Sequence, residues 1–175
     1  SSGLDLILDV MRHHEFDLRL QIKAMPLFWA LAIVCETKQR NEREAQLVEH
    51  ILDSVDSFGA NMELLSATAD ILKGLALQKN SLPLIGSSSV ISMLIRMLHL
   101  GDEHVVMRSS QVLDVLLKNS FDARQILAEN ENGIAEIKLC MAKYPSLEEL
   151  QQRLCSVVES LVVLLDNRFI SELTD

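Results

Sequence analysis

The stretch that decides the fold is GLDLILDVMRHHEFDLRLQIKAMPLFWALA at residues 3–32, because GIAEIKLCMAKYPSLEELQQRLCSVVESLV at residues 133–162 aligns with it without a gap. Both stretches begin with a glycine, continue with an amphipathic segment, break briefly and resume with a longer apolar segment. Self-similarity at a fixed spacing predicts a repeat architecture. The identical pairs include Gly3 and Gly133, Ile7 and Ile137, Met11 and Met141, Leu20 and Leu150, Gln21 and Gln151, and Leu31 and Leu161.

The spacing between these two copies, about 130 residues, equals three periods of about 43, so two further copies are expected between them. Residues 47–76 and 90–117 fill those places with the same apolar pattern. The joins 79–91 (KNSLPLIGSSSVI) and 118–134 (KNSFDARQILAENENGI) also resemble one another. Within each copy the apolar residues recur at helical spacing, and the first copy shows it at Leu4, Ile7, Leu8 and Met11.

The composition favours helices over strands. Of 175 residues, 49% are apolar but only 4% are aromatic, so Leu, Ile, Val, Met and Ala must form most of the core. Strands prefer aromatic and β-branched residues, and six glycines with three prolines are too few for many tight turns. The chain is therefore predicted to be all-α, and its length allows one domain, either complete or a fragment of a longer array.

The net charge of −9 favours a protein as the partner. Nucleic acids and anionic membrane surfaces attract clustered Lys and Arg, whereas the basic residues of this chain are scattered. No nucleic-acid or membrane partner is expected, and a basic or apolar protein segment suits the charge better. Three cysteines without a CxxC pair, and the lack of a long apolar stretch, predict a cytoplasmic protein, with the nucleus as a further location.

The repeat length, the medium helix followed by a long one, and the join at 118–134 resemble the armadillo repeat family over nearly all of residues 3–165. The resemblance implies a right-handed α-solenoid of about four armadillo-like repeats with a period of about 42–45 residues, in one domain spanning residues 1–175. The related HEAT repeat is the alternative. The family's short first helix is expected from Phe121 to Glu129. The expected repeats are 3–40, 43–80, 81–120 and 121–165, followed by a C-terminal cap at 166–175 that folds back on the last repeat.

Two segments, MRHHEFDLRLQ at 11–21 and MAKYPSLEELQ at 141–151, also resemble the N-terminal armadillo arrays of leucine-rich-repeat kinases and similar large scaffolds. Armadillo proteins bind partners in the concave groove lined by their long helices. The resemblance therefore implies a non-catalytic scaffold for protein–protein interaction. Two alternatives stay open: self-association into a homo-oligomer, and a regulatory segment of a larger multidomain protein such as a kinase.

Armadillo proteins that hold extended peptides carry an asparagine on successive long helices. None of the matching positions in this chain is asparagine, so a partner helix or folded domain, which satisfies its own backbone, is expected instead. Those matching positions are Ala30, Gly74, Val115 and Ser160. The residues expected to contact the partner flank them: Trp29, Asp70, Lys73, Gln111, Asp114 and Ser156.

Trp29 is the only tryptophan of the chain and the candidate hot spot, because tryptophan is enriched at the centres of interfaces. The alternative is that it packs between neighbouring long helices. Pro26 lies three residues before it and predicts either a kink or a late start of this helix.

No catalytic, cofactor or metal site is expected. The sequence has no GxSxG motif, and GSSS at 86–89 lacks the lysine of a phosphate loop. His13 and His14 point about 100° apart on a helix and suit a helix C-terminus better than a metal ion. Cys140 and Cys155, on consecutive predicted helices, are expected to be buried free thiols.

Overall fold

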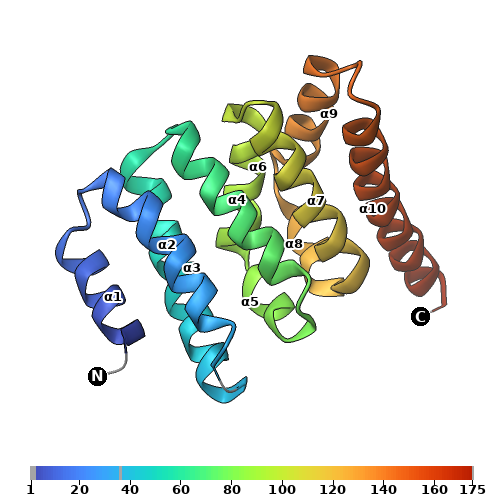
Figure 1. Ribbon diagram of the computed structural model, residues 1–175. Helices are drawn as coiled ribbons and strands as arrows, with labels where there is room; N and C mark the ends of the chain where they lie inside the picture. The colour runs from blue at the N-terminus through green and yellow to red at the C-terminus, as the bar shows by residue number, and fades with distance from the viewer. Residues whose placement is uncertain (1–2, 36, 175) are drawn as a thin grey trace.

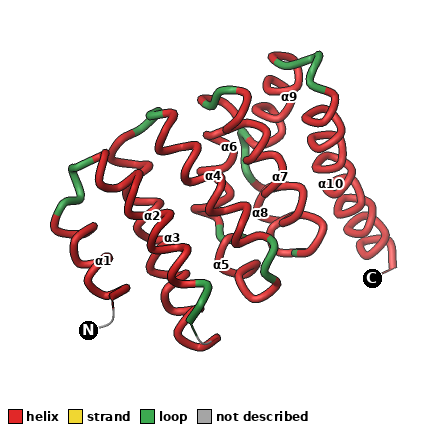
Figure 2. The backbone as a smooth tube through the Cα atoms, in the orientation of Figure 1, coloured by secondary structure: helices red, strands yellow, loops and turns green. Residues whose placement is uncertain are grey.

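Helices account for all the regular structure of the described chain. The computed structural model describes residues 3–35 and 37–174, and within these ranges it has ten α-helices, one short 3-10 helix and no strand (Figures 1 and 2). The prediction of an all-α protein is confirmed. In chain order the elements are α1 (Gly3–His13), α2 (Leu18–Ala32), α3 (Thr37–Phe58), α4 (Met62–Ala76), η1 (Lys79–Ser81), α5 (Leu82–Ile85), α6 (Ser88–Leu100), α7 (Glu103–Asn119), α8 (Phe121–Glu129), α9 (Gly133–Lys143) and α10 (Glu148–Thr174).

Short polar side chains fix the start of four helices. Each accepts a hydrogen bond from the backbone N–H three residues further on, at 3.0 to 3.1 Å, which satisfies one of the free donors of the first turn. The capping residues of α2, α4, α7 and α8 are Asp17, Asn61, Asp102 and Ser120. Between α3 and α4 the chain turns at Gly59, whose φ of 61° lies in the left-handed region that favours glycine.

The helices form two rows. In the first row α2, α4, α7 and α10 contact one another in chain order, as Figure 1 shows from the blue end of the chain to the red end. In the second row α1 and α3 pack against α2, α6 packs against α7, and α9 packs against α10. Apolar side chains fill the space between the rows, and the largest fully buried ones include Phe28, Met11 and Met25.

The two similar joins both contain short helices. Residues 79–85 form η1 and α5, and α8 spans Phe121–Glu129, the bounds predicted from the sequence. Within each join a glycine follows the short helix, and a Cβ atom there would force a neighbouring group to shift. A Cβ atom at Gly86 would lie 2.9 Å from the carbonyl oxygen of Leu82, and one at Gly133 would lie 2.8 Å from Cδ1 of Leu127.

Two glutamines fasten the first and the last helix pair in the same way. The side-chain Nε2 of Gln21, on α2, and that of Gln151, on α10, each donate to two backbone carbonyl oxygens at the end of the preceding helix. The acceptors occupy matching positions: Met11 at 2.9 Å and His14 at 2.8 Å for Gln21, and Met141 and Tyr144, both at 2.9 Å, for Gln151. The sequence similarity of 3–32 and 133–162 therefore corresponds to an identical local structure.

The C-terminal segment continues the last helix. Because α10 runs without interruption to Thr174, residues 166–174 do not fold back, and the predicted C-terminal cap is wrong for this backbone. The physical reason is that the chain has neither glycine nor proline between Leu161 and Thr174 that would end the helix. Side chains from residue 164 onwards lie outside the described residues.

Length alone would let α3 and α10 cross a bilayer, since they have 22 and 27 residues. Among the described residues, however, no single helix is both long and apolar enough for a membrane span. Only residues 79–85 and 88–100 pass that test, jointly and with a bend of 81° between them.

Candidate protein-binding groove

The six residues predicted to contact a partner all lie on the first row of helices. Trp29 is on α2, Asp70 and Lys73 are on α4, Gln111 and Asp114 are on α7, and Ser156 is on α10. Three of them, Trp29, Asp70 and Gln111, line open hollows on this row. Lys73, Asp114 and Ser156 do not.

The larger hollow lies between α2 and α4 and has a volume of about 590 Å³. We call it the α2–α4 hollow. Its apolar lining comes from Ile22, Pro26, Trp29, Met62, Ala67 and Ile71. Its polar lining consists of Glu63, Ser66, Asp70 and Asp102, so every charged side chain in it is acidic.

Trp29 fulfils both roles that the sequence left open. Its indole lies against α4, where a Cβ atom on Gly74 would approach Cζ2 and Nε1 of the ring to 3.1 Å. The side chain is half-buried and packs against the core, yet it also lines the hollow. The absence of a side chain at Gly74 is what gives the indole its place.

Pro26 does not delay the start of its helix, because α2 begins at Leu18. It is exposed and lines the α2–α4 hollow beside Ile22. Proline has no N–H, so the helical hydrogen bond to the carbonyl of Ile22 cannot form.

A second hollow, of about 560 Å³, lies between α7 and α10 and shares Asp102 with the first. We call it the α7–α10 hollow. Its other lining residues are Glu103, His104, Met107, Arg108, Gln111 and Glu149. Because the two hollows share Asp102, they adjoin each other, and we call the two together, along the row from α2 to α10, the groove.

Polar side chains connect three long helices across this groove. Arg108 of α7 pairs with Asp70 of α4 at 3.0 Å and donates to Gln111 at 3.2 Å. Gln111 donates in turn to Glu149 of α10 at 3.1 Å. Asp70 and Gln111, both predicted to contact a partner, are therefore already hydrogen-bonded to neighbouring helices.

Asp114 is not a groove residue, and this part of the prediction is wrong. Only 3% of its side chain is exposed, and its carboxylate accepts hydrogen bonds from Ser156 at 2.6 Å, Arg153 at 3.1 Å and Lys118 at 2.9 Å. Burial alone would raise the pKa of Asp114, but the hydrogen bonds from Lys118, Ser156 and Arg153 lower it below the ordinary value of 3.8. Asp114 and Ser156 hold α7 to α10 instead of facing a partner.

The positions that correspond to the asparagines of peptide-binding armadillo proteins offer no side-chain amide and no free side-chain donor. The indole of Trp29 covers Gly74, and Val115 is apolar. The Ser160 hydroxyl donates to the Ser156 carbonyl of its own helix at 2.9 Å. Ala30 is exposed but apolar.

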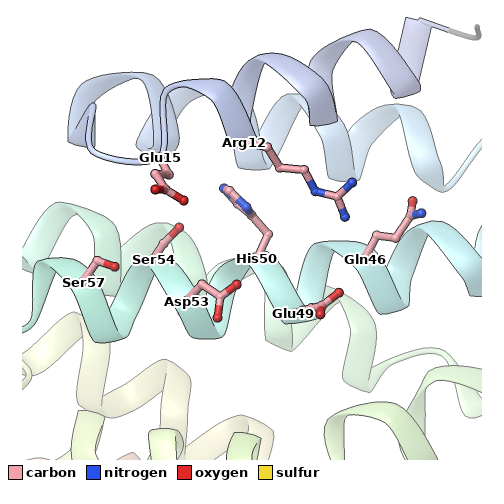
Figure 3. Close-up of a pocket in the computed structure, with 8 residues that line it drawn as sticks. All are labelled: Arg12, Glu15, Gln46, Glu49, His50, Asp53, Ser54 and Ser57. Carbon is pink, nitrogen blue, oxygen red and sulfur yellow. The ribbon is translucent and has the colours of Figure 1, made fainter.

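A third hollow surrounds His50 and is smaller, about 140 Å³ (Figure 3). It lies between α3 and the end of α1, and polar side chains line it: Arg12, Glu15, Gln46, Glu49, His50, Asp53, Ser54 and Ser57. His50 Nε2 lies 2.7 Å from Oε1 of Gln21. Because Nε2 of Gln21 already donates to two carbonyls, its oxygen faces His50, whose Nε2 must carry the proton.

Burial lowers the pKa of His50 below 6.5, so the ring is neutral near pH 7 and serves as a structural donor. Among the described residues no group of three His, Cys, Asp or Glu side chains is placed to hold a metal ion. His13 is the last residue of α1, and its Nδ1 lies 2.7 Å from the carbonyl oxygen of Asp9 in the same helix.

The cysteines are free thiols, but they are not equally buried. Cys140 is buried, and burial raises the pKa of its thiol to about 11. Cys155 is exposed, so the prediction of two buried thiols is wrong for this residue. The reason is its position on the outer side of α10, which no further described helix covers.

The sequence did not reveal most of the residues that line the groove, among them Ile22, Met62 and Asp102, nor the lining role of Pro26. Comparison of the chain with protein-family models, with curated proteins and with solved structures finds no match. The groove therefore has to be interpreted from its own geometry and charge.

Proposed function

We propose that the two rows of helices form a right-handed α-solenoid of four armadillo-like repeats. The matched glutamines of the first and last helix pairs support this proposal, as does α8 at the place of the family's short first helix. The second repeat departs from the pattern. Its α3 is a single helix that begins at Thr37, inside the range 3–40 expected for the first repeat.

We further propose that this solenoid is a non-catalytic scaffold that binds a partner helix or folded domain in the groove along α2, α4, α7 and α10. The observation that carries this proposal is the α2–α4 hollow, where Ile22, Trp29 and Met62 leave apolar surface open beside acidic side chains. Apolar surface that is enclosed on two sides gains most from a side chain that fills it, because water is displaced from both.

The charges around the groove favour a basic partner. Glu63, Asp70 and Asp102 surround the apolar lining of the α2–α4 hollow. An amphipathic helix with an apolar anchor flanked by Lys or Arg complements both features. An extended peptide is less suited, since the asparagine positions offer its backbone no hydrogen bond.

Trp29 allows a direct test because it is the only tryptophan of the chain and lines the groove. The probe is a synthetic helical peptide of Leu and Lys without tryptophan, titrated while the emission of Trp29 is recorded. A Leu and Glu peptide of the same length controls for charge, and a proline-containing Leu and Lys peptide controls for helix formation. We expect only the first peptide to shift the emission.

Ser66→Arg is the decisive variant, since Ser66 lines the α2–α4 hollow and a long cationic side chain would fill it and repel the peptide. We expect at least about tenfold weaker binding, equivalent to about 1.4 kcal/mol. Asn80→Arg adds the same charge at an exposed residue of η1 that lines neither hollow of the groove, and should bind like the wild type. Equal affinities for the wild type and Ser66→Arg would refute the groove as the binding site.

A further inference from the structure

The outer face of α2 is exposed where every other long helix of the first row is buried. Aligning these helices on Leu31, Leu75, Leu116 and Leu161 gives corresponding positions throughout the row. Leu27 and Leu31 of α2 are 52% and 38% exposed. Their counterparts on the three other long helices are at most 3% exposed: Ile71, Leu75, Val112, Leu116, Val157 and Leu161. Leu27 and Leu31 therefore lack the neighbouring helix that covers their counterparts. We call this surface of α2, which also contains Lys23, the front face.

The outer face of α10 shows the complementary pattern. Cys155, Glu159 and Val162 are exposed, and Val162 is 48% exposed. The corresponding residues of α7, which has α10 beside it, are buried: Ser110, Asp114 and Leu117. On the helix behind, Leu139 of α9 is 58% exposed. We call this end, formed by Cys155, Glu159, Val162 and Leu139, the back face.

Charges at the two faces match the ion pairs inside the stack. Arg108 of α7 pairs with Asp70 of α4, and Arg153 of α10 pairs with Asp114 of α7, so each arginine bonds to the preceding long helix. The residue of α2 that corresponds to both arginines is Lys23, which is exposed. The residue of α10 that corresponds to Asp114 is Glu159, also exposed. The front face thus carries the cation, and the back face the anion, of a pair that already forms between α7 and α10.

We propose that a second copy of this chain stacks on the first head to tail, with the front face of one copy against the back face of the other. Lys23 of one copy then meets Glu159 of the next, as Arg153 meets Asp114 within the chain, and Leu27 packs against Val162. Such a contact is heterologous, so each copy keeps one free end and the assembly grows beyond a dimer. The groove runs along the side of the stack, so the inference does not depend on the proposed groove partner.

The test uses two variants that each block one face with a charge repelled by the opposite face. Leu27→Glu blocks the front face, because it would place a carboxylate against the apolar Val162 and near Glu159. Val162→Lys blocks the back face, because it would place an ammonium group against the apolar Leu27 and near Lys23. Sedimentation velocity from about 1 µM to about 1 mM, a range in which weak protein contacts are populated, reports the size distribution. We expect the wild type to form a ladder of oligomers as its concentration rises and each variant alone to stay monomeric.

Mixing the two variants gives the sharpest prediction. One intact front face and one intact back face remain in the mixture, so it should form one-to-one dimers, which neither variant forms alone. Charge exchange within one chain, Lys23→Glu together with Glu159→Lys, should restore the ladder that either change alone weakens. Ser66→Arg, in the groove, should assemble like the wild type, and circular dichroism checks that each variant is folded.

Three outcomes would overturn the proposal. The first is a wild-type chain that stays monomeric at every concentration. The second is a closed dimer that Leu27→Glu abolishes and Val162→Lys leaves intact, since this would mean that two front faces meet. The third is a mixture of the variants that fails to form the one-to-one dimer although both variants are folded.

Discussion

Asp114 and Asp70 make the same kind of contact in different surroundings. Each carboxylate faces an arginine of the next long helix, but the Asp114 side chain is 3% exposed and that of Asp70 is 53% exposed. An exposed ion pair adds little to stability because water solvates both charges well. A buried carboxylate is different, because neutralising it or removing its partners weakens all the hydrogen bonds that it makes. The burial of the carboxylate, and not the presence of an ion pair, therefore decides how much each aspartate contributes to stability.

Asp114→Asn keeps the size of the side chain and removes its charge, so it isolates this effect. We expect a loss of about 1–3 kcal/mol in the free energy of unfolding at pH 7, because Lys118 and Arg153 lose their shared anion. Asp70→Asn is the matched control and should cost less than about 1 kcal/mol. Urea unfolding followed by circular dichroism measures both. Equal losses would contradict the assignment of Asp114 as the buried link.

The pH dependence of Asp114→Asn follows from the lowered pKa of Asp114. A carboxyl group whose folded pKa lies below its unfolded value stabilises the fold above the unfolded value, 3.8, and loses this contribution as the pH falls through the folded value. The stability gap between the wild type and Asp114→Asn should therefore be complete above about pH 5 and shrink below 3.8. A gap that stays constant down to pH 2 would show that the charge is not its cause.

At the scale of the helix pair, the turn between the two helices either contains a glycine or is closed by a glutamine of the second helix. The turns after α3 and α6 contain Gly59 and Gly101, and the residues that correspond to Gln21 there are the buried Leu65 and Val106. The turns after α1 and α9 contain no glycine. In these two turns the side-chain amide of Gln21 or Gln151 satisfies the last carbonyls of the preceding helix. A glutamine is therefore found in the core where the preceding turn lacks glycine, because its amide donates to the carbonyls of that turn.

Replacing either glutamine with leucine, the residue of the second pair, should be destabilising although leucine is accepted at position 65. Gln21→Leu and Gln151→Leu each remove the side-chain hydrogen bond to Met11 or Met141, at a cost of about 1–3 kcal/mol, while the His14 and Tyr144 carbonyls keep a backbone donor. Gln21→Leu should cost more, because His50 also loses its acceptor. Chemical unfolding of the two variants side by side gives the order. A neutral Gln21→Leu would mean that water replaces the amide at no cost.

The sequence predicted those features that depend on spacing within one copy. The periodic apolar residues gave the helices, and the similar joins located α8 at Phe121–Glu129. The sequence could not predict features that depend on whether a neighbouring helix pair covers the residue. The alignment separates Asp114, which corresponds to Lys73, from Asp70, which corresponds to Gln111, but the burial of Asp114 depends on its contacts with α10. Cys155 and Leu27 are of residue types that are buried inside the stack, and only their place at its two ends exposes them.

For the molecule as a whole, each helix pair contacts only its neighbours, so stability is close to a sum of pair and interface contributions. The pair α1 and α2 has a neighbour on one side only and leaves Leu27 and Leu31 exposed. It should therefore open before the centre of the stack. Trp29 reports this event alone, because its indole rests on Gly74 of α4 and no other tryptophan contributes.

We expect the emission of Trp29 to change at a lower urea concentration than the loss of total helix seen by circular dichroism. The measurement belongs in the Val162→Lys background, where assembly through the back face is blocked and both probes report the single chain. The separation of the two transitions should then shrink in the wild type at high protein concentration, because a second copy would cover the front face of most chains and stabilise α1 and α2 by mass action. Coincident transitions in the Val162→Lys chain would instead mean that the four helix pairs unfold as one cooperative unit. In that case the interface between α2 and α4 stabilises the end pair enough to offset its lack of a second neighbour.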